Sequence, residues 1–300
     1  GRSKSLIGPL IDIFRTMTGI DVSVKYGSSG EIAATILEEG SNSPADVFFA
    51  QDPGGLAAVT HVLEPLHDTI IELAPTWATS PEKLWIGVSG RARVIVYNKQ
   101  SVKESDIPKT LDGFTEPKWK GRIGWAPSNG SFQAMVTTMR VIWGEEKTRD
   151  WLSSLQSNEP KVYPKNTPIV AAAASGEIDV GFVNHYYLHR FMKEDGENFG
   201  ARNFFMNSDG PGSVILVTGI GILKTTDNRQ NGEKFIQFLL SNVAQQYFAS
   251  QTFEYPLVDG VATHRLLPPI AELSKPTIDM ASLSDVEGTQ RLLRDIGIIP

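Results

Sequence analysis

The stretch Ile178-Asp179-Val180-Gly181-Phe182-Val183-Asn184-His185-Tyr186-Tyr187 decides how this chain folds. Its first half is a short apolar run, which is typical of a buried strand. Two adjacent tyrosines follow where that predicted strand ends and a loop or helix begins. Ligands of open α/β folds bind at the carboxyl ends of the strands, so Tyr186 and Tyr187 mark a candidate binding site. The alternative is ordinary packing, with one ring in the core and the other half exposed.

The sequence on either side alternates short strands with helices. Strands are predicted at 20–26, 46–50, 84–87, 91–97, 123–125, 178–183 and 214–223, and helical patterns separate most of them. This order is the signature of a sheet covered by helices, so the fold class is α/β. The long apolar strands at 91–97 and 214–223 are candidates for crossings between two α/β halves.

Composition limits the class of protein. The chain has 300 residues, of which 41% are hydrophobic and 21% charged, which is enough for two ordinary domains. The net charge of -6 argues against a nucleic-acid surface. There are no cysteines, so disulfides, thiolate metal sites and cysteine nucleophiles are excluded. The opening residues carry no signal-peptide pattern, as expected of a mature, trimmed or cytosolic chain.

Polar turns follow several of the predicted strands, and each turn leads into a helix. Unpaired N–H groups and a partial positive charge at a helix N-terminus favour anions. Helix capping is the alternative for Asn129 and Ser131. Because these turns recur at equivalent strand ends, we expect them to share one cleft. The turns are Gly27-Ser28-Ser29-Gly30, Ala50-Gln51-Asp52, Asn129-Gly130-Ser131, Lys165-Asn166-Thr167 and Asn184-His185-Tyr186-Tyr187.

Three further patterns leave alternatives open. Arg91 and Arg93 share one side of a predicted strand, where each could bind an anion bidentately or form a surface salt bridge. His185 and His189 stand four residues apart, a spacing that suits zinc, although no carboxylate stands at a companion position. Deprotonated, the two phenols would offer hard anionic oxygens that suit a highly charged cation such as ferric iron.

Enzyme signatures are mostly missing from the sequence. It lacks G-x-S-x-G, H-E-x-x-H and G-x-x-x-x-G-K-[ST] patterns. Gly219-Ile220-Gly221 begins a dinucleotide pattern, but Lys224 stands in place of its third glycine and the motif lies in an apolar strand. A hydrolase or transferase that uses His185 or His189 as a base remains an alternative, with no nucleophile specified.

Several longer motifs give the chain a family resemblance. It resembles the bacterial ferric-ion-binding proteins of iron ABC importers, which are type II periplasmic solute-binding proteins, and the similarity runs nearly end to end. The motifs that carry it are Pro44-Ala45-Asp46-Val47-Phe48-Phe49, Ser89-Gly90-Arg91-Ala92-Arg93-Val94-Ile95-Val96-Tyr97-Asn98, Pro117-Lys118-Trp119-Lys120-Gly121-Arg122-Ile123-Gly124, Asn184-His185-Tyr186-Tyr187 and Glu254-Tyr255-Pro256-Leu257.

The resemblance implies a two-lobed α/β protein. Each lobe would be a mixed sheet flanked by helices, with the ligand cleft between the lobes. We expect one lobe from 1–92 and 218–267 and the other from 93–217 and 268–300. The protein would be no enzyme but a monomeric carrier, periplasmic or lipid-anchored, that delivers iron to an ABC permease in the membrane.

The resemblance also implies a set of ligands. Tyr186 and Tyr187 would bind Fe³⁺ as phenolates, and a synergistic anion, phosphate or carbonate, would complete the coordination. The anion contacts carried over by position are Asn129, Gly130, Ser131, Asn166 and Asn184, with Arg2 and Arg91 as weaker candidates. A metal-free receptor for an anion or a small organic ligand, with the same fold, is the alternative.

Two positions depart from the family pattern. Ser3 stands where many relatives have a histidine ligand, and Gln51 stands where many have a glutamate. Gln51 could still offer a carbonyl oxygen, but it brings no charge. The resemblance further places an opening strand before Gly1, with Arg2 as the surviving anion contact.

Overall fold

The computed structural model describes residues 3–300, which divide into two compact units. Of the described residues, unit 1 comprises 3–90, 216–270 and 278–284, and unit 2 comprises 91–215, 271–277 and 285–300. The sequence-based division had put all of 268–300 in the second lobe. Residues 278–284 belong to unit 1 because the 3-10 helix Met280–Ser284 packs against helix α3 (Pro53–Ala58).

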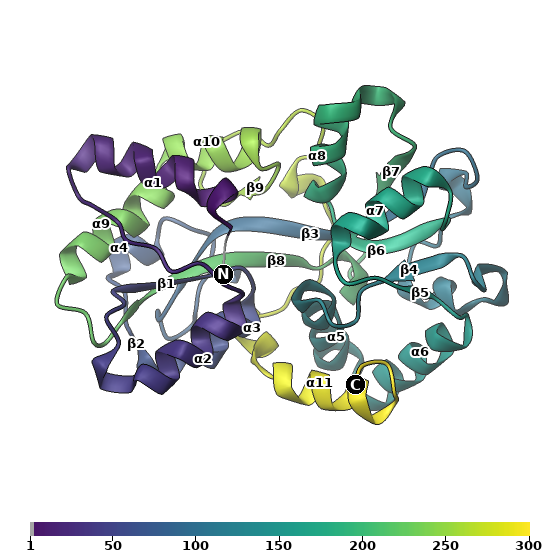
Figure 1. The fold of residues 1–300 in the computed structure, drawn as a ribbon, viewed down its shortest axis with the longest axis horizontal. Helices are drawn as coiled ribbons and strands as arrows, with labels where there is room; N and C mark the ends of the chain where they lie inside the picture. The colour runs from purple at the N-terminus through teal and green to yellow at the C-terminus, as the bar shows by residue number, and fades with distance from the viewer. Residues whose placement is uncertain (1–2) are drawn as a thin grey trace. The chain divides into compact units, whose positions relative to one another are not determined.

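Unit 1 is built on antiparallel strand pairs with helices on both faces. Strand β8 (Ile215–Leu223) is antiparallel to β1, with Ala50 opposite Gly219, and it also pairs with β2. Figure 1 shows α1, α9 and α10 on one side of these strands and α2 and α3 on the other. Besides α3, its elements are α1 (Lys4–Thr18), α2 (Ser29–Glu39), β1 (Val47–Ala50), β2 (Leu63–Glu64), α4 (Asp68–Ile71), α9 (Arg229–Leu239), α10 (Asn242–Gln251) and β9 (Tyr255–Pro256).

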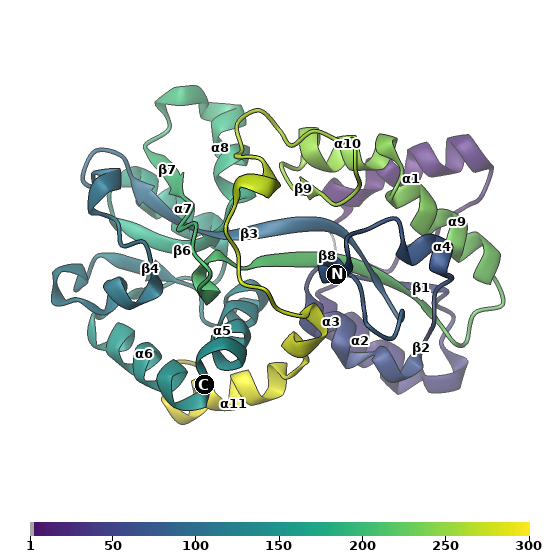
Figure 2. The same ribbon diagram turned by 180° about the vertical axis from the view of Figure 1, so that it is seen from behind.

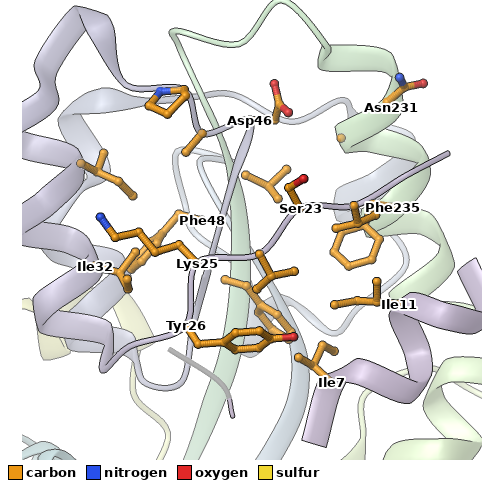
Figure 3. A pocket seen from close by; sticks show the side chains of 18 of the residues that line it. Ile7, Ile11, Ser23, Lys25, Tyr26, Ile32, Asp46, Phe48, Asn231 and Phe235 are labelled. Carbon is orange, nitrogen blue, oxygen red and sulfur yellow. The ribbon is translucent and has the colours of Figure 1, made fainter. Parts of the chain in front are cut away.

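The predicted strand at 20–26 is wrong as a paired strand, since no ladder is assigned there. Val24 and Tyr26 remain 40% and 39% exposed, so the apolar alternation that suggested a strand is not buried. A pocket of about 540 Å³ lies along this segment. Figure 3 shows its walls: Ile7 and Ile11 come from α1, and Ile32 comes from α2. Without a neighbouring strand to bond to, an alternating pattern alone does not make a ladder.

Unit 2 is built around strand β6, which lies between β3 (Ile86–Asn98) and β4. It is antiparallel to β3, with Arg93 opposite Asn184, and parallel to β4. Figure 2, the view from behind, shows the helices of this unit around β6 and β4. Its elements are β4 (Ile123–Trp125), α5 (Gly130–Trp143), α6 (Glu145–Ser157), β5 (Lys161–Val162), α7 (Asn166–Ser175), β6 (Val180–Asn184), α8 (Tyr186–Asp195), β7 (Ala201–Phe204) and α11 (Val286–Asp295).

Two long strands contain the boundaries between the units. The sequence predicts separate strands at 84–87 and 91–97, but the structure has one strand, β3 (Ile86–Asn98), that is buried along its whole length. The extended backbone runs unbroken through Ser89 and Gly90, which pair with β9. Strand β8 (Ile215–Leu223) is also fully buried, as its apolar sequence predicts.

Each unit has its own apolar core. In unit 1, Phe14 of α1 packs edge-on against Phe235 of α9, with ring centroids 5.1 Å apart. In unit 2, Phe182 of β6 contacts Phe114, Phe132 and Trp151. Phe182 therefore anchors β6 in the core immediately before the tyrosine pair. No helix among residues 3–300 is long and apolar enough to span a bilayer.

Candidate functional site

The tyrosine pair lies where a buried strand passes directly into a helix. Strand β6 ends at Asn184, and α8 begins at Tyr186, with His185 between them already in a helical conformation. The rings of Tyr186 and Tyr187 stack with centroids 4.4 Å apart and an interplanar angle of 28°. Tyr186 is buried and Tyr187 partly buried. The first turn of α8 thus holds two phenols side by side.

Two arginines of β3 are buried in the same unit. Arg91 is 1% exposed and Arg93 is 2% exposed. Nε and Nη2 of both side chains are buried without a hydrogen-bond partner among residues 3–300. The arginine ion pairs found in that range involve other arginines. Surface salt bridges, the alternative for these arginines, are therefore not what the structure shows.

One nitrogen of Arg93 joins three of the predicted anion-binding residues. Its Nη1 donates to Asn184 Oδ1 at 3.0 Å, Ser131 Oγ at 3.2 Å and Asn166 Oδ1 at 3.4 Å. Asn166 Oδ1 also accepts a bond from the backbone N–H of Asn184 at 3.1 Å. Arg93 therefore gathers the ends of α5, α7 and β6 around one guanidinium, and its Nε and Nη2 remain available.

Asn129 serves as a helix cap within this network. Its Oδ1 accepts from the Ser131 N–H at 3.1 Å, from Ser131 Oγ at 2.6 Å and from Asn166 Nδ2 at 3.1 Å. Gly130 is the first residue of α5, directly after the cap. The capping alternative is correct for Asn129, and the same bonds tie α5 to α7.

Charge around the tyrosines comes from arginines. Burial lowers the pKa of Arg93 to about 9, with the neighbouring charge of Arg91 acting in the same direction and the two tyrosines opposing it. Burial raises the pKa of Tyr187, as do the charge of Tyr186 and a side-chain hydrogen bond with it, while Arg190 and Arg91 lower it. At pH 7 Arg93 is cationic and the Tyr187 phenol is neutral.

Arg190 is a neighbour of the pair that sequence reasoning missed. Its Cζ lies 4.8 Å from the ring centroid of Tyr186 and 5.1 Å from that of Tyr187. The signal was its spacing, since residues three and four apart on a helix share a face. Arg93 was noted in the sequence as a possible anion ligand, but its central place in the network was not foreseen.

The histidine alternatives find little support in the geometry. Nδ1 of His185 lies 3.1 Å from the N–H of Ala92, from which it accepts a hydrogen bond. This bond occupies the lone pair that a metal would need at that nitrogen. Within the described residues, no group of three or more His, Asp or Glu side chains is arranged to hold a metal ion.

Gln51 and Ser3, the two positions that depart from the family pattern, belong to unit 1. Gln51 directly follows β1, and its N–H donates to Ser29 Oγ at 2.9 Å. Ser3 precedes α1 and is exposed. Arg2 lies outside the described residues. Unit 2 alone brings together both tyrosines, Arg91 and every predicted anion contact except Arg2.

Comparison with known proteins assigns the family. The model of the family described as bacterial extracellular solute-binding protein matches residues 9–274. The chain is 35% identical to the major ferric iron-binding protein of Neisseria meningitidis over 303 aligned positions, covering 99% of this chain and 91% of that protein. The chain belongs to the bacterial extracellular solute-binding proteins, in the family that includes the ferric iron-binding proteins.

Solved structures agree with this solute-binding protein in fold. The crystal structure of iron-bound HitA from Pseudomonas aeruginosa is 31% identical, with a TM-score of 0.93 over 99% of this chain and 97% of that one. A Trichodesmium protein in complex with iron and citrate is 30% identical, with a TM-score of 0.88 over the same shares of the two chains. These relatives share the periplasmic-binding-protein fold. The Neisseria protein is named for ferric iron binding and the two solved structures hold iron, so the relatives are binding proteins rather than enzymes.

Proposed function

We propose that this solute-binding protein captures ferric iron with the phenolates of Tyr186 and Tyr187 and a synergistic anion. The observation that carries the proposal is the stacked pair of phenols, with ring centroids 4.4 Å apart, in contact with Arg190, which has no carboxylate partner among residues 3–300. The iron named for the Neisseria relative and for HitA supports the same cargo. Two hard phenolate oxygens suit a trivalent cation and partly neutralise it.

A trivalent cation supplies what the phenols lack at neutral pH. An unperturbed tyrosine has a pKa near ~10, and burial raises that of Tyr187 further. Bound metal ions drive deprotonation of their ligands, so iron uptake releases the phenolic protons. Affinity for iron must then fall as the pH falls.

The anion completes the charge balance. Arg91, Arg93 and Arg190 bring three positive charges and Fe³⁺ brings three more, so the surroundings of the pair stay strongly cationic after both phenols ionise. We infer that phosphate or carbonate binds the free Nε and Nη2 groups of Arg91 and Arg93, with the ends of α5 and α7 close by. Guanidinium groups recognise such oxyanions bidentately. Citrate, present with iron in the Trichodesmium relative, belongs to the same chemical class of oxyanion.

Other partners follow from the same proposal. Gln51 is a candidate uncharged oxygen donor to the iron. The iron-loaded protein would work as a monomer in the periplasm or at the outer face of the membrane, and deliver its cargo to the permease of an ABC importer. The periplasmic Fe³⁺-binding protein of Serratia marcescens, 29% identical over 99% of this chain, supports that location.

Ferric titration tests the proposal. Loading with ferric iron in the presence of phosphate should produce a visible phenolate-to-iron charge-transfer band. We expect Tyr186→Phe and Tyr187→Phe each to reduce the band and to weaken iron binding at least about 100-fold, since each removes a charged ligand. Tyr163→Phe, a phenol bonded to Glu177 elsewhere in unit 2, is the matched control. Unchanged band and affinity in both variants of the pair would refute the assignment.

A second candidate function rests on the unpaired arginines. A cluster of buried guanidinium groups is by itself a receptor for an oxyanion or a small organic acid, with no metal. After complete removal of iron with a chelator, such a receptor would bind phosphate or citrate as tightly as before, and iron would add nothing. The ferric function predicts instead that iron and anion strengthen each other's binding.

A further inference from the structure

Arg190 stands one helical turn beyond the tyrosine pair. It lies four residues after Tyr186 and three after Tyr187, and both spacings place side chains on one face of a helix. Its guanidinium carbon is 4.8 Å and 5.1 Å from the two ring centroids, and the rings are 4.4 Å from each other. One cation therefore contacts both phenol rings at once.

Arg190 makes this contact with the rings without forming an ion pair to a carboxylate among residues 3–300. Nη2 of Arg190 is buried without a hydrogen-bond partner among residues 3–300, and the ion pairs found there do not include this arginine. A buried charge is costly unless something compensates it. The aromatic faces of the two tyrosines supply part of that compensation through cation–π attraction.

The same contact changes in character when the phenols ionise. A phenolate carries a full negative charge, so its attraction to a nearby guanidinium is far stronger than that of a neutral ring. The geometry therefore places the guanidinium where it attracts the negative charge that both rings would carry as iron ligands. The guanidinium does so without occupying a coordination position.

We propose that Arg190 is a positioning residue for the ferric site, which holds the two phenol rings together and stabilises them as phenolates when iron binds. The proposal rests on the proposed function, because it presupposes that Tyr186 and Tyr187 are the iron ligands. It adds that the positive charge of Arg190, and not only the two phenolate ligands, sets the iron affinity and the electronic properties of the site.

A spectroscopic readout separates this role from mere packing. A positive charge beside a phenolate lowers the energy of its donor electrons, which moves the charge-transfer band to shorter wavelength. In Arg190→Gln we expect the ferric band to shift to longer wavelength and iron affinity to fall about tenfold, the scale of a desolvated cation–π contact. Arg190→Lys keeps the charge but not the planar stack, so the band should stay near the wild-type wavelength while affinity falls less.

The experiment compares these variants with Lys193→Gln, all loaded with ferric iron and phosphate. Lys193 lies on the same helix and is exposed, so its substitution removes an equal charge without touching the rings. Circular dichroism of the metal-free proteins checks folding, and Arg190→Met, which also removes the charge, replaces the Gln variant if that one does not fold. Near-ultraviolet difference spectra of the metal-free proteins give a second readout, in which loss of the stack should change the tyrosine signal.

The outcomes distinguish the two proposals. A wild-type band that moves to longer wavelength in Arg190→Gln, and not in Lys193→Gln, supports the positioning role. A wild-type band that is lost in Tyr186→Phe but unmoved in Arg190→Gln, with unchanged affinity and unchanged near-ultraviolet signal, overturns the role of Arg190 and leaves the ferric function standing. Absence of any phenolate band in the wild type overturns both.

Discussion

Two groups of arginines in unit 2 differ in how their charge is balanced. Arg140, on α5, bonds Glu145 at 2.6 Å and Asp285 at 2.8 Å, and its Nη1 donates to Thr289 at 3.0 Å. Arg91 and Arg93 are more deeply buried, yet their Nε and Nη2 groups have no partner among the described residues. The first arrangement fastens α11 to α5. Arg91 and Arg93 instead keep their positive charge without a carboxylate partner among the described residues, and this arrangement suits the binding of an anion.

The comparison has a thermodynamic meaning. A buried charge without a partner costs stability, and the fold tolerates it where a ligand compensates. A paired charge contributes modestly to stability and offers nothing to a ligand. Substitutions in the two groups should therefore have opposite effects on binding and on stability.

Arg91→Met should have the largest effect. Methionine fills a similar unbranched volume without charge, so we expect the metal-free, anion-free protein to melt at an equal or higher temperature than the wild type. Binding of phosphate should weaken about 100-fold, because a buried charge-assisted contact is lost. Differential scanning calorimetry in chloride buffer and calorimetric phosphate titration measure the two quantities. A lower melting temperature with unchanged phosphate affinity would show that Arg91 is structural.

Asn166→Ala should have an intermediate effect. Its Oδ1 accepts from the backbone N–H of Asn184 and from Arg93, so the substitution removes the acceptor of that N–H and one of the three acceptors of Arg93 Nη1. We expect phosphate affinity to fall about tenfold through misplacement of Arg93, and stability to fall by about 1–2 kcal/mol. Phosphate titration and urea unfolding check these values. Asn158→Ala is the control, because Asn158 bonds backbone carbonyls elsewhere in unit 2.

Arg140→Gln should leave anion binding unchanged and lower stability by about 1–2 kcal/mol. The pH dependence follows from Asp285, whose pKa is lowered chiefly by its hydrogen bond with Arg140. A lowered carboxylate pKa stabilises the fold above the unfolded value and loses that effect as the pH falls through the folded value. The stability difference between wild type and variant, measured by urea unfolding, should therefore persist at pH 7 and shrink below about pH 4. A difference that grows in acid would contradict this pairing.

Much of unit 2 could be predicted from the sequence, and the reasons are local. The apolar run that ends at Asn184 forms β6, since Val180 and Phe182 have a core to enter. The tyrosines lie at its carboxyl end because a helix begins there. Asn129 caps α5 because a polar side chain before a helix satisfies its first N–H groups. Each of these outcomes depends on a few neighbouring residues.

The rest depended on contacts that a sequence does not display. Arg93 joins Ser131, Asn166 and Asn184, which are far apart in the chain, so the network could not be foreseen from any one motif. The alternation at 20–26 suggested a strand, but a ladder needs a partner as well as a pattern. Arg190 is the one missed residue that the sequence could have revealed, because it stands four and three residues after the two tyrosines on the same predicted helix.

Resonance Raman spectroscopy of the ferric-loaded protein, excited within the visible band, tests the central claim most directly. It enhances the vibrations of groups bonded to iron, and ring-deuterated tyrosine identifies them. We predict enhanced tyrosinate ring modes that shift on deuteration, with reduced intensity in Tyr186→Phe and in Tyr187→Phe. A ferric-loaded protein without tyrosinate modes, or with modes that survive both substitutions, would contradict the account.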